Sequence, residues 1–152
     1  MTDHWMMYLG ALALSLAITV PLIVRDDRQG RTANLRIAIV LIAVAQLGFA
    51  FLGFSTVAIF LALALFFGGF NFLEAGLPSR LSGLADDAVR GASLGVFSTA
   101  QFLGIFTGGL LGGRFLASGT PAVFVLCALL AATWLAIVGI GGRDSAPETV
   151  TE

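Results

Sequence analysis

Charged residues are scarce in this chain. Asp, Glu, Lys and Arg together make up 11% of the 152 residues, and no lysine is present, whereas soluble domains carry about 25% charged residues. Hydrophobic residues make up 58%, and the mean hydropathy is +0.98. So few charges cannot cover the surface of a soluble domain of this size with polar groups. The composition therefore predicts an integral membrane protein whose apolar surface faces the lipid bilayer.

Residue types that carry much enzyme and metal chemistry are also scarce. His4 is the only histidine, and the only cysteine, Cys127, has no partner for an internal disulfide. A His/Cys metal cluster, a phosphate-binding Gly-x-x-x-x-Gly-Lys-Ser/Thr loop and a nucleophile–base pair are all missing from the sequence. The net charge of -1 and the lack of a basic tract argue against a nucleic-acid partner. We expect no enzymatic activity, no cofactor and no metal.

Long apolar runs dominate the rest of the sequence. A membrane-crossing helix needs about 20 mostly apolar residues, and the run 35–78 would make roughly 65 Å of helix. It must therefore fold back at its only polar break, 53–56. The sequence predicts an all-α integral membrane protein, a single bundle of about five transmembrane helices, with a loop from Arg80 to Arg90. The expected spans are about 5–24, 35–54, 56–78, 92–116 and 122–141, followed by a polar tail at 143–152.

The first run has a second interpretation, a cleaved signal peptide. Asp3 is the only charged residue before this run, so the positively charged n-region of a signal peptide is missing. The run is also longer than the usual hydrophobic region. We therefore favour a membrane span.

The arginines predict the orientation in the membrane. Only Arg114 falls on one side of a five-span arrangement. The arginines on the other side are Arg25, Arg28, Arg31, Arg36, Arg80, Arg90 and Arg143. By the positive-inside rule, the N-terminus lies outside and the C-terminus in the cytoplasm of a multi-pass protein of the bacterial inner membrane.

The fourth span is rich in glycine. Gly104, Gly108 and Gly112 recur at every fourth residue, with Gly109 and Gly113 beside them. Small residues at this spacing let two helix backbones approach closely in lipid. The five glycines predict a tight helix crossing or a bending helix, with static helix packing as the simpler interpretation.

A few polar side chains lie within the predicted spans. Gln101 lies on roughly the glycine face of the fourth span, and Asn71 and Glu74 lie less than one turn apart on the third. An ionisable group within a span indicates a functional site. Glu74 is therefore a candidate protonatable or gating carboxylate, and its alternative role is an interfacial ion pair with Arg80 or Arg90.

Charged residues between the first two spans form a second candidate group. The loop 25–31 carries charges of both signs and a glycine, and it can tie two helix ends by charge-assisted hydrogen bonds. Plain anchoring of the helix ends at the membrane surface is the alternative. The candidate gating residues here are Asp27, Arg28, Gly30 and Arg31.

Three stretches of the sequence resemble the C-terminal half of a major facilitator superfamily transporter of the drug/proton antiporter-like kind. The stretch 4–24 resembles the eighth helix of that family, 71–79 the end of the tenth, and 90–104 the start of the eleventh. The resemblance covers about 4–142, and it implies helices eight to twelve.

Two weaker copies of family motifs add to this resemblance. The cytoplasmic signature G-x-x-x-D-R-x-G-R-R is matched at Asp27, Arg28, Gly30 and Arg31, with Ile23 and Thr32 as departures. The antiporter pattern G-x-x-x-G-P-x-x-G-G is matched at Gly104, Gly108, Gly112 and Gly113, with Gly109 in place of the proline. The first departure weakens a gating latch, and the second removes a built-in kink.

The resemblance implies a function for a longer parent protein. The family has twelve helices in two halves, with the solute site between the halves, so this chain alone is not expected to transport. It would be a fragment of a secondary transporter, needing the missing N-terminal helices or a partner chain. In the parent, Asn71 and Gln101 would contact a small solute, and Glu74, Arg90 and the loop 25–31 would serve proton exchange or gating. The alternative is a non-transporting membrane module that assembles through the glycine face.

The predicted orientation can be tested with single cysteines in a Cys127→Ala background. Cysteines at positions 30 and 85 should react with a membrane-impermeant thiol reagent only from the cytoplasmic side, because most arginines lie there. Cysteines at positions 2 and 119 should react only from outside. Labelling of position 30 from outside would reverse the topology.

Overall fold

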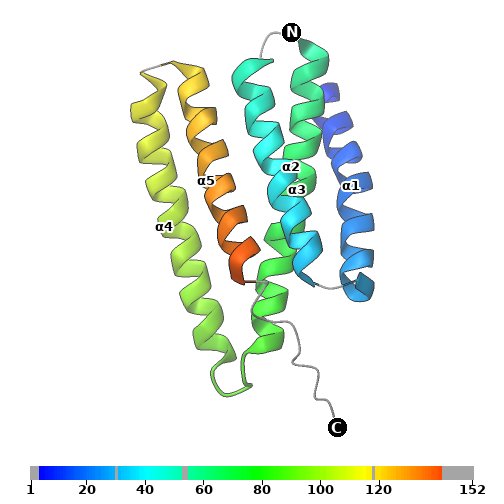
Figure 1. Cartoon of the computed structure of the whole chain (residues 1–152), viewed down its shortest axis with the longest axis vertical. Helices are drawn as coiled ribbons and strands as arrows, with labels where there is room; N and C mark the ends of the chain where they lie inside the picture. Colours follow the sequence, from blue (N-terminus) through cyan, green and yellow to red (C-terminus); the bar gives the residue numbers. More distant parts are fainter. Residues whose placement is uncertain (1–3, 30, 53–54, 118, 142–152) are drawn as a thin grey trace.

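In the residues that it describes, the computed structural model shows five helices (Figure 1). It describes residues 4–29, 31–52, 55–117 and 119–141, with the side chains of 4–7, 25–29, 31, 120 and 141 outside this description. The prediction of an all-α membrane bundle is confirmed. The helices are α1 (His4–Gln29), α2 (Arg31–Phe51), α3 (Thr56–Leu84), α4 (Arg90–Leu116) and α5 (Thr120–Gly141).

The helices have the length and composition of membrane spans. Helices α2, α3, α4 and α5 are each long and apolar enough to cross a bilayer, while α1 has a shorter apolar stretch, Tyr8–Val24. Large apolar side chains are exposed on every helix. In a protein with this much exposed apolar surface, lipid takes the place that water has around a soluble domain.

The helices pack around α2 and α3. Helix α2 packs along both α3 and α5, α3 also packs against α1, and α4 lies at the edge of the bundle beside α5 (Figure 1). Buried apolar residues from four helices form the core. They are Leu22 of α1, Ala38 and Ile39 of α2, Phe72 and Leu73 of α3, and Ala131 of α5.

Glycines allow α3 to approach two neighbours closely. A methyl group at Gly69 would lie 2.6 Å from the backbone oxygen of Ala38 in α2, and one at Gly68 would lie 2.9 Å from the side chain of Ile18 in α1. The Thr19 hydroxyl of α1 also donates a hydrogen bond of 3.1 Å to the Gly68 carbonyl. A side chain at Gly69 would therefore force a shift of the α2 backbone, and one at Gly68 would force the Ile18 side chain to move.

The glycines of α4 have no such neighbour. None of the residues of α4 is buried, and a methyl group at any of its five clustered glycines would meet no atom of the described chain within 4 Å. The helix crossing that the sequence predicts at Gly108 is therefore not made by another described helix of this chain.

Two predicted loops are shorter in the structure. The sequence predicts a loop from Arg80 to Arg90, but α3 continues through Pro78 to Leu84, and α4 begins at Arg90. Proline is tolerated in membrane helices because side chains and local adjustments satisfy the freed backbone groups. Likewise, α1 extends through the charged cluster to Gln29, and α2 begins at Arg31.

The structure predicts different outcomes for alanine at two glycines of the same helix. Gly69→Ala should destabilise the bundle by roughly 1–3 kcal/mol, because overpacking against the α2 backbone forces a shift. Gly76→Ala should be neutral or stabilising, since nothing lies within 4 Å of a methyl group there and alanine favours helix by up to about 1 kcal/mol. The free energy of unfolding of each variant can be measured in mixed detergent with increasing denaturant. Equal stability of the two variants would contradict the close crossing at Gly69.

Candidate functional site

Two of the predicted polar residues meet across α3 and α4. The side-chain amide of Gln101 donates hydrogen bonds to both carboxylate oxygens of Glu74, at 3.0 Å to Oε1 and 3.1 Å to Oε2. Glu74 lies on α3 and Gln101 on α4, so the pair joins two helices that otherwise contact each other little. Hydrogen bonds to a charged acceptor are stronger than those to a neutral one. This pair therefore fixes the position of α4 relative to α3.

The pair lies at an apolar crevice of about 350 Å³ between α3, α4 and α5, with α2 beneath. Glu74 is the only charged residue among those that line the crevice, and three lining residues are aromatic. The lining residues are Ile42, Phe70, Leu73, Glu74, Leu77, Phe97, Ala100, Gln101 and Trp134. A carboxylate in such a crevice favours contact with a strong hydrogen-bond donor, which the Gln101 amide provides here.

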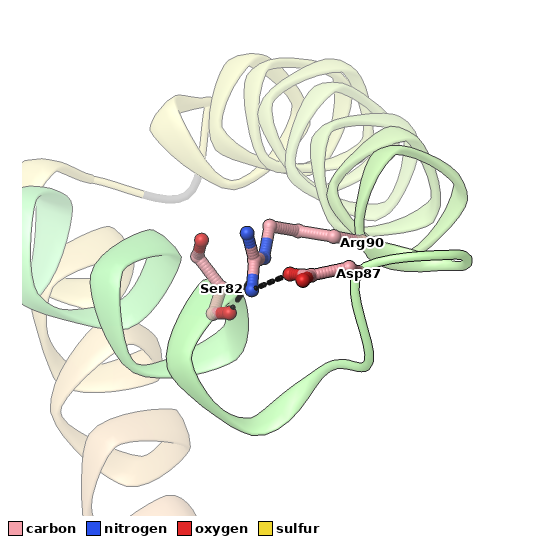
Figure 2. A network of polar contacts seen from close by, with 3 residues as sticks. All are labelled: Ser82, Asp87 and Arg90. Atoms are coloured by element: carbon pink, nitrogen blue, oxygen red, sulfur yellow. Dashed lines mark hydrogen bonds and ion pairs between the residues drawn. The ribbon is translucent and has the colours of Figure 1, made fainter.

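Arg90 lies at the turn between α3 and α4 and does not pair with Glu74. Its Nε donates a 3.0 Å hydrogen bond to the carbonyl of Ser82, and its Nη2 lies 2.5 Å from Oδ1 of Asp87 (Figure 2). Ser82 belongs to the last turn of α3, where carbonyls lack helical partners. Arg90 therefore closes the end of α3 and fixes the short turn.

The expected ion pair at Glu74 is thus replaced by the contact with Gln101. The physical reason is the length of α3. The turn begins at Ala85, so about three helical turns separate it from Glu74, and the Arg90 side chain stays at the turn. The other candidate, Arg80, lies with its guanidinium 5.7 Å from the centre of the Phe72 ring, a cation–π distance.

The remaining candidate residues do not line this crevice. Asn71 lies one turn before Glu74 on α3 and is half-buried, but it is not among the lining residues. In the first turn between helices, Gly30 and the side chains of Asp27, Arg28 and Arg31 lie outside the described residues. The gating role assigned to these four therefore stays a prediction.

The structure adds residues that the sequence did not single out. Trp134 of α5, Phe97 of α4 and Phe70 of α3 line the crevice beside Glu74. An aromatic residue in an apolar helix carries no sequence signal that separates a crevice wall from a lipid-facing side chain. The four-residue spacing from Phe97 to Gln101 does place both on one face of α4, but only the fold shows that this face turns toward α3.

Known transporters are similar in sequence to this chain. The inner membrane transport protein YajR of Escherichia coli is 34% identical over 140 residues, which are 89% of this chain and 30% of that protein. An uncharacterized transporter of Buchnera aphidicola subsp. Acyrthosiphon pisum is 33% identical over 107 residues, or 70% of this chain and 27% of that protein. This chain is a relative of membrane transporters. No protein-family model matches it.

The similarity confirms the resemblance to a transporter. The chain spans about 30% of the length of the Escherichia coli relative, which agrees with part of a major facilitator transporter. With four helices long and apolar enough to span a bilayer, it is a multi-pass membrane protein.

The contact between Glu74 and Gln101 predicts energetic coupling of the two residues. In a double-mutant cycle with Glu74→Leu and Gln101→Leu, the coupling should be about 0.6–1.7 kcal/mol, the range for hydrogen bonds between membrane helices. Thr99→Val is a matched control on α4, because the Thr99 hydroxyl bonds to the carbonyl of Gly95 in its own helix. Stability in detergent is the measurement, and additive single effects would show that the contact does not hold α4.

Proposed function

We propose that the chain is the C-terminal part of a proton-coupled secondary transporter of the major facilitator superfamily that exports a small solute or a drug-like molecule. The observation that carries this proposal is the carboxylate–amide pair of Glu74 and Gln101, set in an apolar crevice of a chain related to transporters. Glu74 lies within a helix that is long and apolar enough to span a bilayer, and a carboxylate inside a membrane span indicates a functional role by default.

Proton exchange at Glu74 would change the contact between α3 and α4. A carboxylate accepts charge-assisted hydrogen bonds from the Gln101 amide, whereas a protonated carboxyl accepts weaker ones. Proton uptake would therefore loosen α4 from α3, and proton release would restore the contact. The lining residues contain no second titratable group that would oppose this change.

The other candidate residues complete the proposal. Asn71 and Gln101 would contact solute or water in the cavity of the full-length parent. Arg90 would keep the turn between α3 and α4 rigid while α4 moves, because its contacts with Ser82 and Asp87 do not involve Glu74. Asp27 and Arg31, with the residues between them, would tie the cytoplasmic ends of α1 and α2.

The proposed setting is the bacterial inner membrane, with the N-terminus outside and the C-terminus in the cytoplasm. Arg36, Arg80 and Arg90 lie near the ends of helices at the turns between α1 and α2 and between α3 and α4. Both turns lie at the same end of the bundle (Figure 1). Arg114 is in the last turn of α4, at the opposite end. This distribution follows the positive-inside rule.

A second candidate function is a membrane module that assembles by helix packing and does not transport. The open glycine face of α4 favours it, since a helix with no buried residue needs a partner. It accounts less well for Glu74, because a packing surface in lipid gains nothing from a carboxylate.

The transport proposal can be tested in a restored transporter, in which the chain replaces the aligned 140 residues of the Escherichia coli relative. Glu74→Gln should abolish the pH dependence of transport in vesicles and leave solute binding within about two-fold, because glutamine keeps the shape but cannot exchange a proton. Asp86→Asn, at the exposed turn, is the matched control. An unchanged pH profile in Glu74→Gln would refute the proton role, and a restored protein that folds without moving any solute would refute the transport function.

A further inference from the structure

We infer that α3 contains a hinge at residues 74–78, about which the end of α3, the following turn and α4 swing as one unit. The hinge bends when the contact between Glu74 and Gln101 is lost. The trigger, a proton on Glu74, rests on the proposed function, whereas the hinge itself is a property of this chain.

Pro78 removes a hydrogen bond from the backbone of α3. Proline has no backbone N–H, so the carbonyl of Glu74, four residues earlier, lacks its helical partner. Gly76 lies between these two residues, and nothing lies within 4 Å of a methyl group there. Glycine weakens a helix by up to about 1 kcal/mol relative to alanine, and sharp bends in helices occur at prolines. The segment 74–78 is therefore the part of α3 that bends most easily.

The packing of α3 changes at the same segment. Before it, Phe72 and Leu73 are buried, and Leu77 is the last apolar residue of α3 that packs against the buried core. None of the residues 74–84 is buried. The end of α3 and the start of α4 also extend beyond the neighbouring ends of α1, α2 and α5 (Figure 1). The part of α3 before the hinge is thus fixed in the bundle, and the part after it has room to move.

The turn between α3 and α4 binds the end of one helix to the start of the other. Arg90 of α4 donates a 3.0 Å hydrogen bond to the Ser82 carbonyl of α3 and pairs with Asp87 (Figure 2). Within the turn, the Val89 N–H donates a 3.0 Å hydrogen bond to the Asp86 carbonyl. These contacts hold the angle between the two helices at the turn, so a change in the direction of α4 must be taken up within α3. The hinge, which lacks a backbone hydrogen bond, takes up this change.

Glu74 joins the hinge to the contact that locks it. Its carbonyl is the group that Pro78 leaves without a helical donor, and its carboxylate accepts two hydrogen bonds from Gln101. Helices α3 and α4 otherwise contact each other little, so these two bonds oppose a swing of α4. They are weaker when the carboxyl group is neutral. A static kink would account for Pro78, but it would not account for a lock on the same residue and a loosely packed helix end beyond it.

The test measures the distance between nitroxide labels at positions 37 and 84 of the full chain in lipid vesicles, in a Cys127→Ala background. Ile37 lies on α2, on the fixed side of the hinge, and Leu84 lies at the end of α3; both side chains are exposed. Pulsed electron paramagnetic resonance gives the distribution of distances. Glu74→Gln, which makes this side chain neutral, should broaden the distribution at least about two-fold, because the hydrogen bonds to Gln101 lose their charge.

Substitutions at the hinge should reverse this broadening. Pro78→Ala in the Glu74→Gln chain should return the distribution to about the wild-type width, since alanine restores the missing N–H. Gly76→Ala should narrow it by a smaller amount, because alanine favours helix more than glycine does. Pro21→Ala is the matched control, since it removes the proline inside α1 and should leave the width unchanged.

A second pair of labels, at positions 84 and 96, tests whether the end of α3 and α4 move together. Leu84 and Val96 are both exposed, and they lie on the two sides of the turn. Because both belong to the proposed moving unit, the distance between these labels should stay the same in every variant.

Three results would overturn the inference. They are unchanged broadening in both Pro78→Ala and Gly76→Ala, equal narrowing by Pro21→Ala, and a change between labels 84 and 96 as large as that between labels 37 and 84. If Glu74→Gln leaves the distribution unchanged but Pro78→Ala narrows it in the wild-type chain, the hinge stands and the proton role in the proposed function is wrong.

Discussion

The close approach of α3 to α1 and α2 is the constraint on which the rest of the structure depends. Membrane helices gain no hydrophobic free energy from association in lipid, so close packing and interhelical hydrogen bonds must hold them together. Gly68 and Gly69 bring α3 against two helices, and Thr19 adds a hydrogen bond at the same crossing. This fixes α3 within the bundle, so that Glu74, further along the helix, faces the crevice.

The polar side chains of the bundle divide into two kinds. Some satisfy backbone groups, as when Arg36 donates to the Val138 carbonyl near the end of α5 and Arg90 donates to Ser82. These contacts close helix ends, where carbonyls lack partners. The Glu74–Gln101 contact joins two side chains on different helices, and its strength depends on the charge of the carboxylate. It is therefore the contact on which the proposed proton exchange would act.

The sequence predicted the helices well and the contacts less well. Long apolar runs and polar breaks were sufficient for five helices, because lipid allows few other structures. The end of α3 was missed because Pro78 and Arg80 are typical of a helix boundary, yet the helix continues to Leu84. Because α3 continues to Leu84, Arg90 stays away from Glu74, and the Glu74 carboxylate pairs with Gln101 instead. This pairing depends on the rotation of α3 and α4 about their own axes, which the sequence does not specify. Trp134 was missed for the same reason, since helical packing places it at the crevice.

In the proposed function, a proton on Glu74 would weaken the hydrogen bonds from Gln101, because these bonds are charge-assisted. The Arg90 contacts at the turn between α3 and α4 do not involve Glu74. Loss of the Gln101 contact would therefore leave α4 held at Arg90, where the helix begins. Helix α4 would then pivot at this end of the bundle, and this motion would open a path between the helices.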